Sequence, residues 1–174
     1  MNESRDEREI EVVRSLGFEI CVLGRKTENN SLFSLPVEKA VWKDVNPLTP
    51  VIKSTALNRL FCQIPWAREA RRMKADVISC HDIAYLFIGW LSTWGMHKKP
   101  LLVYDSHEFE CERVDHRSGF LRFLIKHMER FLMRRCAFSI MVNDSIADAV
   151  QDLHSLKERP IVVRNIPENW KLDS

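Results

Sequence analysis

Two stretches of this chain decide its fold class, and they read Ala75-Asp76-Val77-Ile78-Ser79-Cys80-His81-Asp82 and Lys99-Pro100-Leu101-Leu102-Val103-Tyr104-Asp105-Ser106-His107-Glu108. Each opens with a charged or proline entry, continues through apolar residues typical of a buried strand, and ends in histidine and carboxylate side chains. In an open parallel sheet, ligands bind in the crevice beyond the carboxyl ends of the strands. The two stretches therefore predict two neighbouring strands whose ends form a site.

Helical and strand-like patterns alternate along the rest of the chain. Helices are expected at residues 4–16, 55–74, 83–94, 120–136 and 144–153, and strands at residues 18–23, 41–45, 77–80, 101–104, 138–142 and 161–163. Gly17 marks the end of the first helix, Pro65 predicts a kink or break in the second, and Asp144 is the expected N-cap of the last. This alternation predicts an α/β fold, a mostly parallel sheet with helices on both faces.

Composition limits the class of protein further. The 174 residues have room for one domain with a sizeable core, and 26 Lys and Arg against 24 Asp and Glu leave a charge of only +2, so no nucleic-acid partner is expected. The five cysteines are scattered without a Cys-x-x-Cys spacing, which favours free thiols in a reducing cytoplasm. No apolar run reaches the ~20 residues that span a bilayer. The charged first residues are unlike a secretory signal. A cytoplasmic location is expected.

The candidate site residues begin with His81 and Asp82. A histidine at a strand end can donate to or accept from a sugar hydroxyl or a phosphate, and a carboxylate can accept from hydroxyl groups. Asp82 could equally serve as the cap of the helix that follows, and the two roles are compatible.

A stronger cluster follows the next strand, where four polar residues stand in a row: Asp105, Ser106, His107 and Glu108. Asp105 or Ser106 could satisfy backbone donors of a loop while His107 and Glu108 face the crevice, or the four could form a polar turn without a ligand. Asn143 and Asn165 end the last two strands, where they fit the same crevice or ordinary turn and cap chemistry.

Other chemistries find less support in the sequence. His81, Asp82, His107 and Glu108 are suitable metal ligands by type, but their spacing does not require a metal, and none is predicted. A hydrolytic triad is disfavoured because Gly-x-Ser-x-Gly is missing. A flavodoxin-like or other nucleotide-binding domain is disfavoured because neither Gly-x-Gly-x-x-Gly nor a P-loop occurs.

The expected helix at residues 120–136 is both basic and apolar. Its basic residues are Arg122, Lys126, His127, Arg130, Arg134 and Arg135, and they alternate with Phe123, Leu124, Met128, Phe131 and Leu132. Such a helix is either a surface helix with its apolar stripe on the sheet or one that lies on anionic lipid. The first interpretation is favoured, and peripheral contact with the inner face of a membrane is the second.

In this order, the motifs resemble the N-terminal domain of glycosyltransferase family 4, whose GT-B architecture sets two Rossmann-like domains across a cleft. The resemblance runs from Arg5 to Pro167 and rests on these segments: Arg5-Asp6-Glu7-Arg8, Ser15-Leu16-Gly17-Phe18-Glu19-Ile20, Ala75-Asp76-Val77-Ile78 to His81-Asp82, Tyr104-Asp105-Ser106-His107-Glu108, Glu129-Arg130, the strand at 138–142, and Val162-Val163-Arg164-Asn165-Ile166-Pro167.

The resemblance implies a retaining, metal-independent transfer of a sugar from a nucleotide-sugar donor to a glycan, lipid or small-molecule acceptor. It implies that this domain binds the acceptor. His107 matches the family histidine that contacts the transferred sugar and is the catalytic candidate, whereas His81 and Asp82 would shape the acceptor side. No cofactor is expected in this chain, and the nucleotide-sugar donor belongs to the complete enzyme.

Two parts of the family pattern are not found, namely the first strand with its glycine-containing loop and the C-terminal donor-binding domain. Residues 1–174 are therefore expected to form a single N-terminal Rossmann-like domain that is inactive alone and is completed by that domain or by a partner chain. The absent strand predicts a gap in the sheet, which a rearranged strand order, an exchanged segment or a homodimer would resolve. The alternative function is a non-catalytic binding subunit or a degenerate module of the same fold.

Overall fold

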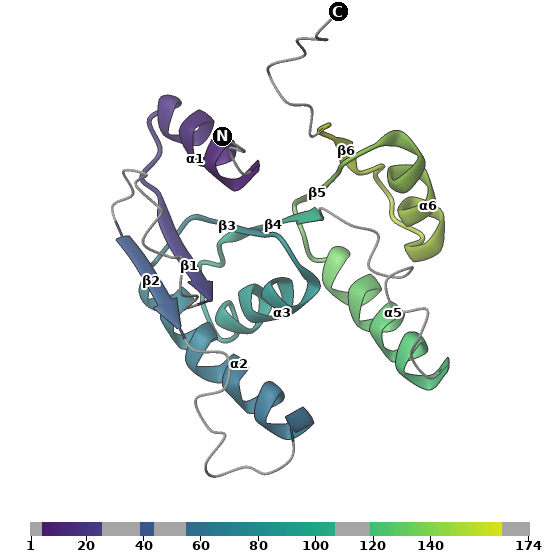
Figure 1. The fold of residues 1–174 in the computed structure, drawn as a ribbon, viewed down its shortest axis with the longest axis horizontal. Helices are drawn as coiled ribbons and strands as arrows, with labels where there is room; N and C mark the ends of the chain where they lie inside the picture. The colour runs from purple at the N-terminus through teal and green to yellow at the C-terminus, as the bar shows by residue number, and fades with distance from the viewer. Residues whose placement is uncertain (1–4, 26–38, 44–54, 107–118, 165–174) are drawn as a thin grey trace, which may run out of the picture. The chain divides into compact units, whose positions relative to one another are not determined.

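The computed structural model describes residues 5–25, 39–43, 55–106 and 119–164, which fall into two compact units, Met1–Ala75 and Asp76–Ser174 (Figure 1). Each unit contains parallel strands together with helices, and each is described by itself.

The first unit holds helix α1 (Arg5–Ser15), strands β1 (Cys21–Arg25) and β2 (Lys39–Lys43), and helix α2 (Thr55–Arg72). α1 ends at Ser15, and Gly17 follows in the turn as expected, with a φ of +86° that glycine adopts without strain. β1 and β2 pair in parallel, and β1 begins later than the sequence predicted. α2 runs through Pro65 without the break that the proline allowed.

The second unit is built on a sheet of four parallel strands in the order β3-β4-β5-β6, namely β3 (Val77–Cys80), β4 (Leu101–Ser106), β5 (Phe138–Met141) and β6 (Ile161–Val162). The strands lie side by side in the order in which the chain forms them, with Cys80 opposite Tyr104 and Ser106 opposite Met141. This confirms the expected α/β fold with parallel strands. The two stretches that decided the fold class form β3, with the predicted bounds, and β4, which begins as predicted and ends two residues later.

Helices α3 (Ile83–Ser92), α5 (Gly119–Met133) and α6 (Asp144–His154) connect these strands. Because each crossover moves one strand further in the same direction, a uniform right hand places all three helices on one face of the sheet. That face carries the core of the unit, in which strand residues meet helix residues: Cys80, Tyr104, Met141, Ile83, Leu86, Leu132, Met133, Ala147 and Val150.

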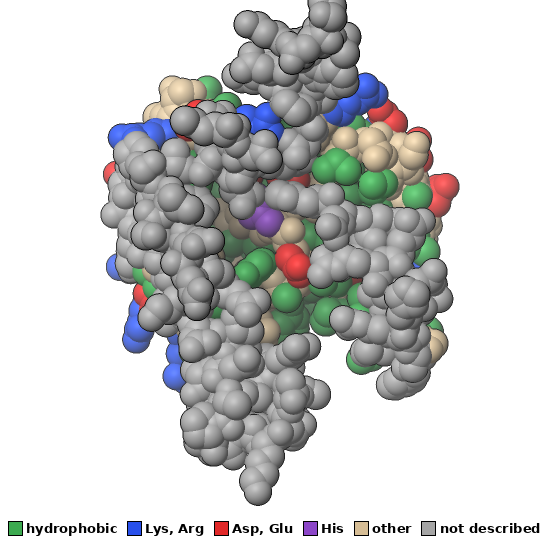
Figure 2. Space-filling model, viewed as in Figure 1, with side chains coloured by type: hydrophobic (Ala, Val, Ile, Leu, Met, Phe, Trp, Pro, Cys, Tyr) green, Lys and Arg blue, Asp and Glu red, His purple; other side chains and the backbone are tan. Residues whose placement is uncertain are grey.

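The described strands form two sheets, β1-β2 in the first unit and β3-β4-β5-β6 in the second. Several large apolar side chains stay exposed on the described residues, and hydrophobic patches are visible on the face drawn in Figure 2. Within the part of the chain that the structure describes, no helix is both long and apolar enough to cross a membrane.

Candidate functional site

The candidate site lies at the carboxyl edge of the sheet in the second unit. β3, β4 and β5 end at Cys80, Ser106 and Met141, and because the strands are parallel neighbours, the residues that follow them share this edge. Of the residues that the sequence singled out, the described ones at this edge are His81 and Asp82 after β3, Asp105 and Ser106 at the end of β4, and Asn143 after β5.

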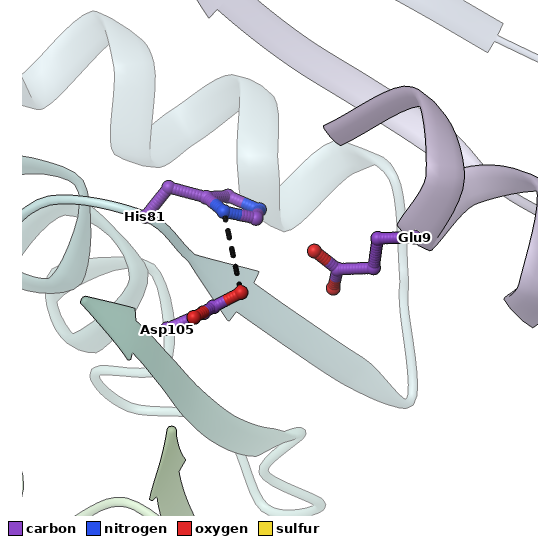
Figure 3. A group of neighbouring side chains, drawn as sticks. All are labelled: Glu9, His81 and Asp105. Carbon is purple, nitrogen blue, oxygen red and sulfur yellow. Dashed lines mark ion pairs between the residues drawn. The ribbon is translucent and has the colours of Figure 1, made fainter. Parts of the chain in front are cut away.

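Among the described site residues that the sequence predicted, His81 and Asp105 lie close to each other. Cys80 pairs with Tyr104, so the next residue of each chain segment, His81 and Asp105, lies at the same level of the edge. The imidazole Nδ1 of His81 lies 3.9 Å from Oδ2 of Asp105, with the His81 side chain 32% exposed and the Asp105 side chain 3% exposed (Figure 3). The distance is that of a charge contact rather than a hydrogen bond. A buried carboxylate thus faces a ring that solvent and ligands can reach.

Asp105 and Ser106 belong to the strand and not to the loop where the sequence placed them. They pair with Ile140 and Met141 of β5, which extends β4 beyond the expected end at residue 104. Both are buried in the structure. Each therefore places a buried polar group at the edge of the sheet.

Asp82 and Asn143 serve as helix caps. The carboxylate of Asp82 accepts a hydrogen bond of 2.7 Å from the backbone N–H of Ala84, and Asn143 Oδ1 accepts one of 2.8 Å from the backbone N–H of Ile146. The expectation that Asp144 caps the last helix is wrong, because Asn143 holds the extended backbone that a cap requires and Asp144 is already the first helical residue. The capping alternatives for Asp82 and Asn143 are confirmed.

Three predicted site residues, His107, Glu108 and Asn165, lie outside the described residues. Their roles stay predictions. Glu9, which Figure 3 also draws, belongs to helix α1 of the first unit.

Sequence reasoning missed an ion-pair cluster around the start of α6. Asp144 accepts hydrogen bonds of 3.0 Å from both Arg159 and Arg164, and Arg159 also donates to Asp148 at 2.6 Å. These two arginines hold the pKa of Asp144 below its ordinary value, and the acidic partners raise the pKa of Arg159. Arg164 follows β6 closely. A signal was present in the sequence, because the two arginines flank the last strand.

Sequence reasoning also missed a buried polar group on the core face of the sheet. Glu129 of α5 lies between Tyr104 of β4, whose hydroxyl donates to Oε1 at 3.4 Å, and His154 of α6, whose Nε2 lies 3.2 Å from Oε2. The His154 contact has the separation of an ion pair without the alignment of a hydrogen bond. All three side chains are buried. No spacing in the sequence joins them, since each comes from a different element.

The thiols of Cys80 and Cys136 are unreactive at neutral pH. Burial raises the pKa of Cys80 to about 12, with the neighbouring Cys136 adding to the shift, and burial raises the pKa of Cys136 to about 12. Both remain protonated at neutral pH, so neither supplies a thiolate nucleophile or metal ligand there.

The comparison with protein families finds a match. The family model described as Glycosyltransferase Family 4 matches residues 10–165, which is most of the chain and includes every described strand. A search of the curated proteins found no match.

Proposed function

Because this chain belongs to glycosyltransferase family 4, we propose that its carboxyl edge forms the acceptor side of a sugar-transfer site. The complete reaction moves a sugar from a nucleotide-sugar to a glycan, lipid or small-molecule acceptor, with retention of configuration and without a metal. The observation that carries the proposal is the pair of His81 and Asp105 at the ends of β3 and β4.

The chemistry of that pair suits sugar hydroxyls. A neutral imidazole offers one donor and one acceptor, and a carboxylate accepts only, so together they match the mixed donors and acceptors of a sugar ring. Asp105 is nearly buried, so its contact with His81 is weakly screened and holds the ring in place. Fixed polar groups at a partly dry edge orient an acceptor before reaction.

His107 is proposed to contact the transferred sugar, as the corresponding histidine does in the family. It directly follows Ser106, the last residue of β4. His81, Asp82, Asp105, Ser106, Glu108, Asn143 and Asn165 are proposed to bind substrate. For Asp82 and Asn143, the cap leaves other lone pairs on the side-chain oxygens for a ligand.

The donor's diphosphate needs groups of another kind. Phosphates are bound by cations, backbone amides and glycine-rich loops, whereas the described pair at this edge is an imidazole and a carboxylate. We therefore propose that a donor-binding domain, on the same polypeptide or on a partner chain, holds the nucleotide. Residues 1–174 alone are then inactive in transfer.

The runner-up is a binding module that holds a glycan without transferring sugar. The observation in its favour is the use of Asp82 and Asn143 as helix caps, because it leaves less of the predicted side-chain chemistry for a reaction.

Complementation tests the proposal. The chain is mixed or coexpressed with a donor-binding domain from a family 4 enzyme, and release of nucleoside diphosphate is followed with uridine- and guanosine-diphosphate sugars and a panel of simple glycosides. Release only in the combined sample, with His107→Ala inactive and His81→Ala raising KM for the acceptor more than it lowers kcat, supports the proposal. Turnover by residues 1–174 alone contradicts the need for a second domain.

A matched control comes from the opposite edge of the same two strands. Asp76 precedes β3 and pairs with Lys98, which precedes β4, at 3.1 Å, so Asp76→Asn removes an aspartate charge at the amino edge. It should leave KM unchanged while Asp105→Asn raises it. Saturation-transfer NMR with the same glycosides identifies the runner-up, which predicts acceptor binding but no diphosphate release in any combination.

A further inference from the structure

The outer face of α5 carries a row of exposed aromatic side chains that continues onto the end of α3. Phe123 stacks on His127 with ring centroids 3.9 Å apart, and one turn further along, Phe131 meets Trp90 of α3 edge to face at 5.3 Å. Trp90 in turn stacks on Trp94 at 5.8 Å. We call these five residues, Trp90, Trp94, Phe123, His127 and Phe131, the aromatic ridge.

Most of the ridge is open to solvent, whereas Trp90 is half-buried against the core. Phe123 is 57% exposed and Trp94 is 68% exposed, and Leu124, next to Phe123, is 52% exposed. Large apolar side chains that gather on a surface mark an interaction site more often than scattered ones do. Tryptophan and phenylalanine are also the residues that an amphipathic helix inserts at the boundary between lipid headgroups and acyl chains.

The charges around the aromatic ridge indicate which kind of partner it binds. Glu129, the one acidic residue in the sequence of α5, is buried in the core, so none of the described side chains of this helix exposes a carboxylate. Arg135 lies over the ring of Phe131 at 3.4 Å, and Lys126 is half-buried beside His127. Arg130 and Arg134 are tied to α6 through Ser155, at 3.1 Å each.

We propose that the aromatic ridge and its flanking cations dock this domain onto an anionic lipid surface. The apolar side chains would enter the headgroup region while Lys126 and Arg135 meet lipid phosphates. A second copy of the chain is a poorer fit, because a two-fold contact would set these cations against their own copies. A nucleic acid is a poorer fit because it offers nothing apolar to the side chains of Leu124 and Phe123.

Flotation of the full chain with lipid vesicles tests the proposal. The chain should bind vesicles of phosphatidylcholine enriched in phosphatidylglycerol and should not bind vesicles of phosphatidylcholine alone. Binding should weaken as salt rises, since the Debye length shortens from about 30 Å at 0.01 M to about 10 Å at 0.1 M. No binding to the anionic vesicles at low salt overturns the proposal, as does equal binding to both kinds of vesicle.

Paired variants locate the surface. Lys126→Gln with Arg135→Gln should weaken binding about fivefold per charge removed, and Phe123→Ser with Leu124→Ser should weaken it at least tenfold. The controls are Lys98→Gln, a surface cation on the amino edge, and Leu101→Ser, an apolar side chain of β4 as exposed as Phe123. Circular dichroism confirms that each variant is folded. Equal losses in the controls overturn the assignment to the ridge.

Further measurements distinguish a lipid surface from other partners of the ridge. Sedimentation should show that the ridge variants leave the oligomeric state unchanged, and a shift from dimer to monomer would assign the ridge to a second copy instead. Trp94→Phe should reduce the blue shift of fluorescence on vesicle binding, because Trp94 enters the lipid. Competition by short duplex DNA that removes the chain from vesicles completely would point to a polyanion site and overturn the lipid proposal.

Discussion

Two histidine–carboxylate pairs in the second unit, His81 with Asp105 and His154 with Glu129, differ in their surroundings. Both lie beside β4, where Asp105 belongs to the first pair and its neighbour Tyr104 contacts the second. Asp105 faces His81 at the carboxyl edge, where the imidazole is partly exposed, whereas the side chain of the preceding residue, Tyr104, points to the opposite face and meets Glu129 and His154 in the core. Successive side chains of a strand alternate between faces, so one step along β4 separates a site from a core network.

The same residue types therefore serve different purposes. A solvent-facing ring can exchange protons and hydrogen bonds with a ligand, while a ring with no exposed surface can only hold its neighbours together. Residue type alone does not identify a functional histidine. The face of the strand and the exposure of the ring separate the two cases, and the following predictions test that separation from the largest expected effect to the smallest.

Removal of the Glu129 carboxylate from the core should lower the free energy of unfolding more than any other change proposed here. Glu129→Ala leaves His154 and Tyr104 buried without their shared partner, and breaking such a pair destabilises a protein by about 3–5 kcal/mol. Urea unfolding followed by circular dichroism measures the change. His81→Ala is the comparison at the edge and should change stability by less than about 1 kcal/mol, because solvent can replace its contacts. Equal losses for the two variants would abolish the distinction between them.

Thiol labelling should show that the side chain of Cys80, at the end of β3, belongs to the buried core and not to the exposed edge. The pKa of about 12 for Cys80, against an ordinary 9.0, makes its thiolate about a thousandfold rarer at neutral pH. Iodoacetamide should modify exposed Cys21 in the folded protein and reach Cys80 only after denaturation. Mass spectrometry of the digested chain reports both sites. Rapid native labelling of Cys80 would place it at the edge with His81.

Close packing behind β3 makes Gly89 sensitive to a single methyl group. A Cβ at this position would lie 2.9 Å from Cys80 Sγ, so Gly89→Ala should destabilise the protein by about 1–3 kcal/mol despite the better helix propensity of alanine. Gly119→Ala is the control, because nothing lies within 4 Å of the added atom. The control should be neutral or slightly stabilising in thermal unfolding. A stabilised Gly89→Ala variant would show that α3 packs loosely on the sheet.

Substitutions at the two edges of β3 and β4 should also differ in their effect on stability, by a smaller amount than the variants above. Asp105→Asn changes a nearly buried carboxylate that faces His81 and should cost about 1–2 kcal/mol. Asp76→Asn changes an exposed one and should stay within about 0.5 kcal/mol. Chemical unfolding of the two variants under identical conditions makes the comparison. A larger loss of stability for Asp76→Asn than for Asp105→Asn would show that the amino edge contributes more to stability than the carboxyl edge.

The smallest effect is expected at the surface cluster of Asp144, Arg159 and Arg164. The arginines lower the pKa of Asp144 below 3.8, so its stabilising contribution is present above that pH and is lost as pH falls through the lowered pKa. Thermal unfolding of wild type and Asp144→Asn should differ slightly at neutral pH and converge in acid. A difference that grows in acid would contradict the assignment.

The sequence predicted the fold where apolar runs are clearly bounded. β3 and β4 were found for this reason, although β4 is buried along most of its length and β3 is buried only at Cys80, and α3 was found because it is apolar throughout. The site was predicted in part: His81 and Asp105 do meet, but Asp105 and Ser106 continue the strand because pairing with β5 extends it. The Glu129 network was out of reach, since it depends on tertiary packing among three elements that no local pattern connects.

The hydrogen bonds from Arg130 and Arg134 to Ser155 have a consequence for local opening. Ser155 ends α6 in a left-handed conformation with φ of +50°, and both arginines belong to α5 or the turn that ends it. The two helices are thus fastened at one end, and Glu129 and His154 join them again inside. Amide hydrogen exchange in α5 and α6 should therefore follow a single shared opening free energy, so that the helix pair forms one cooperative unit.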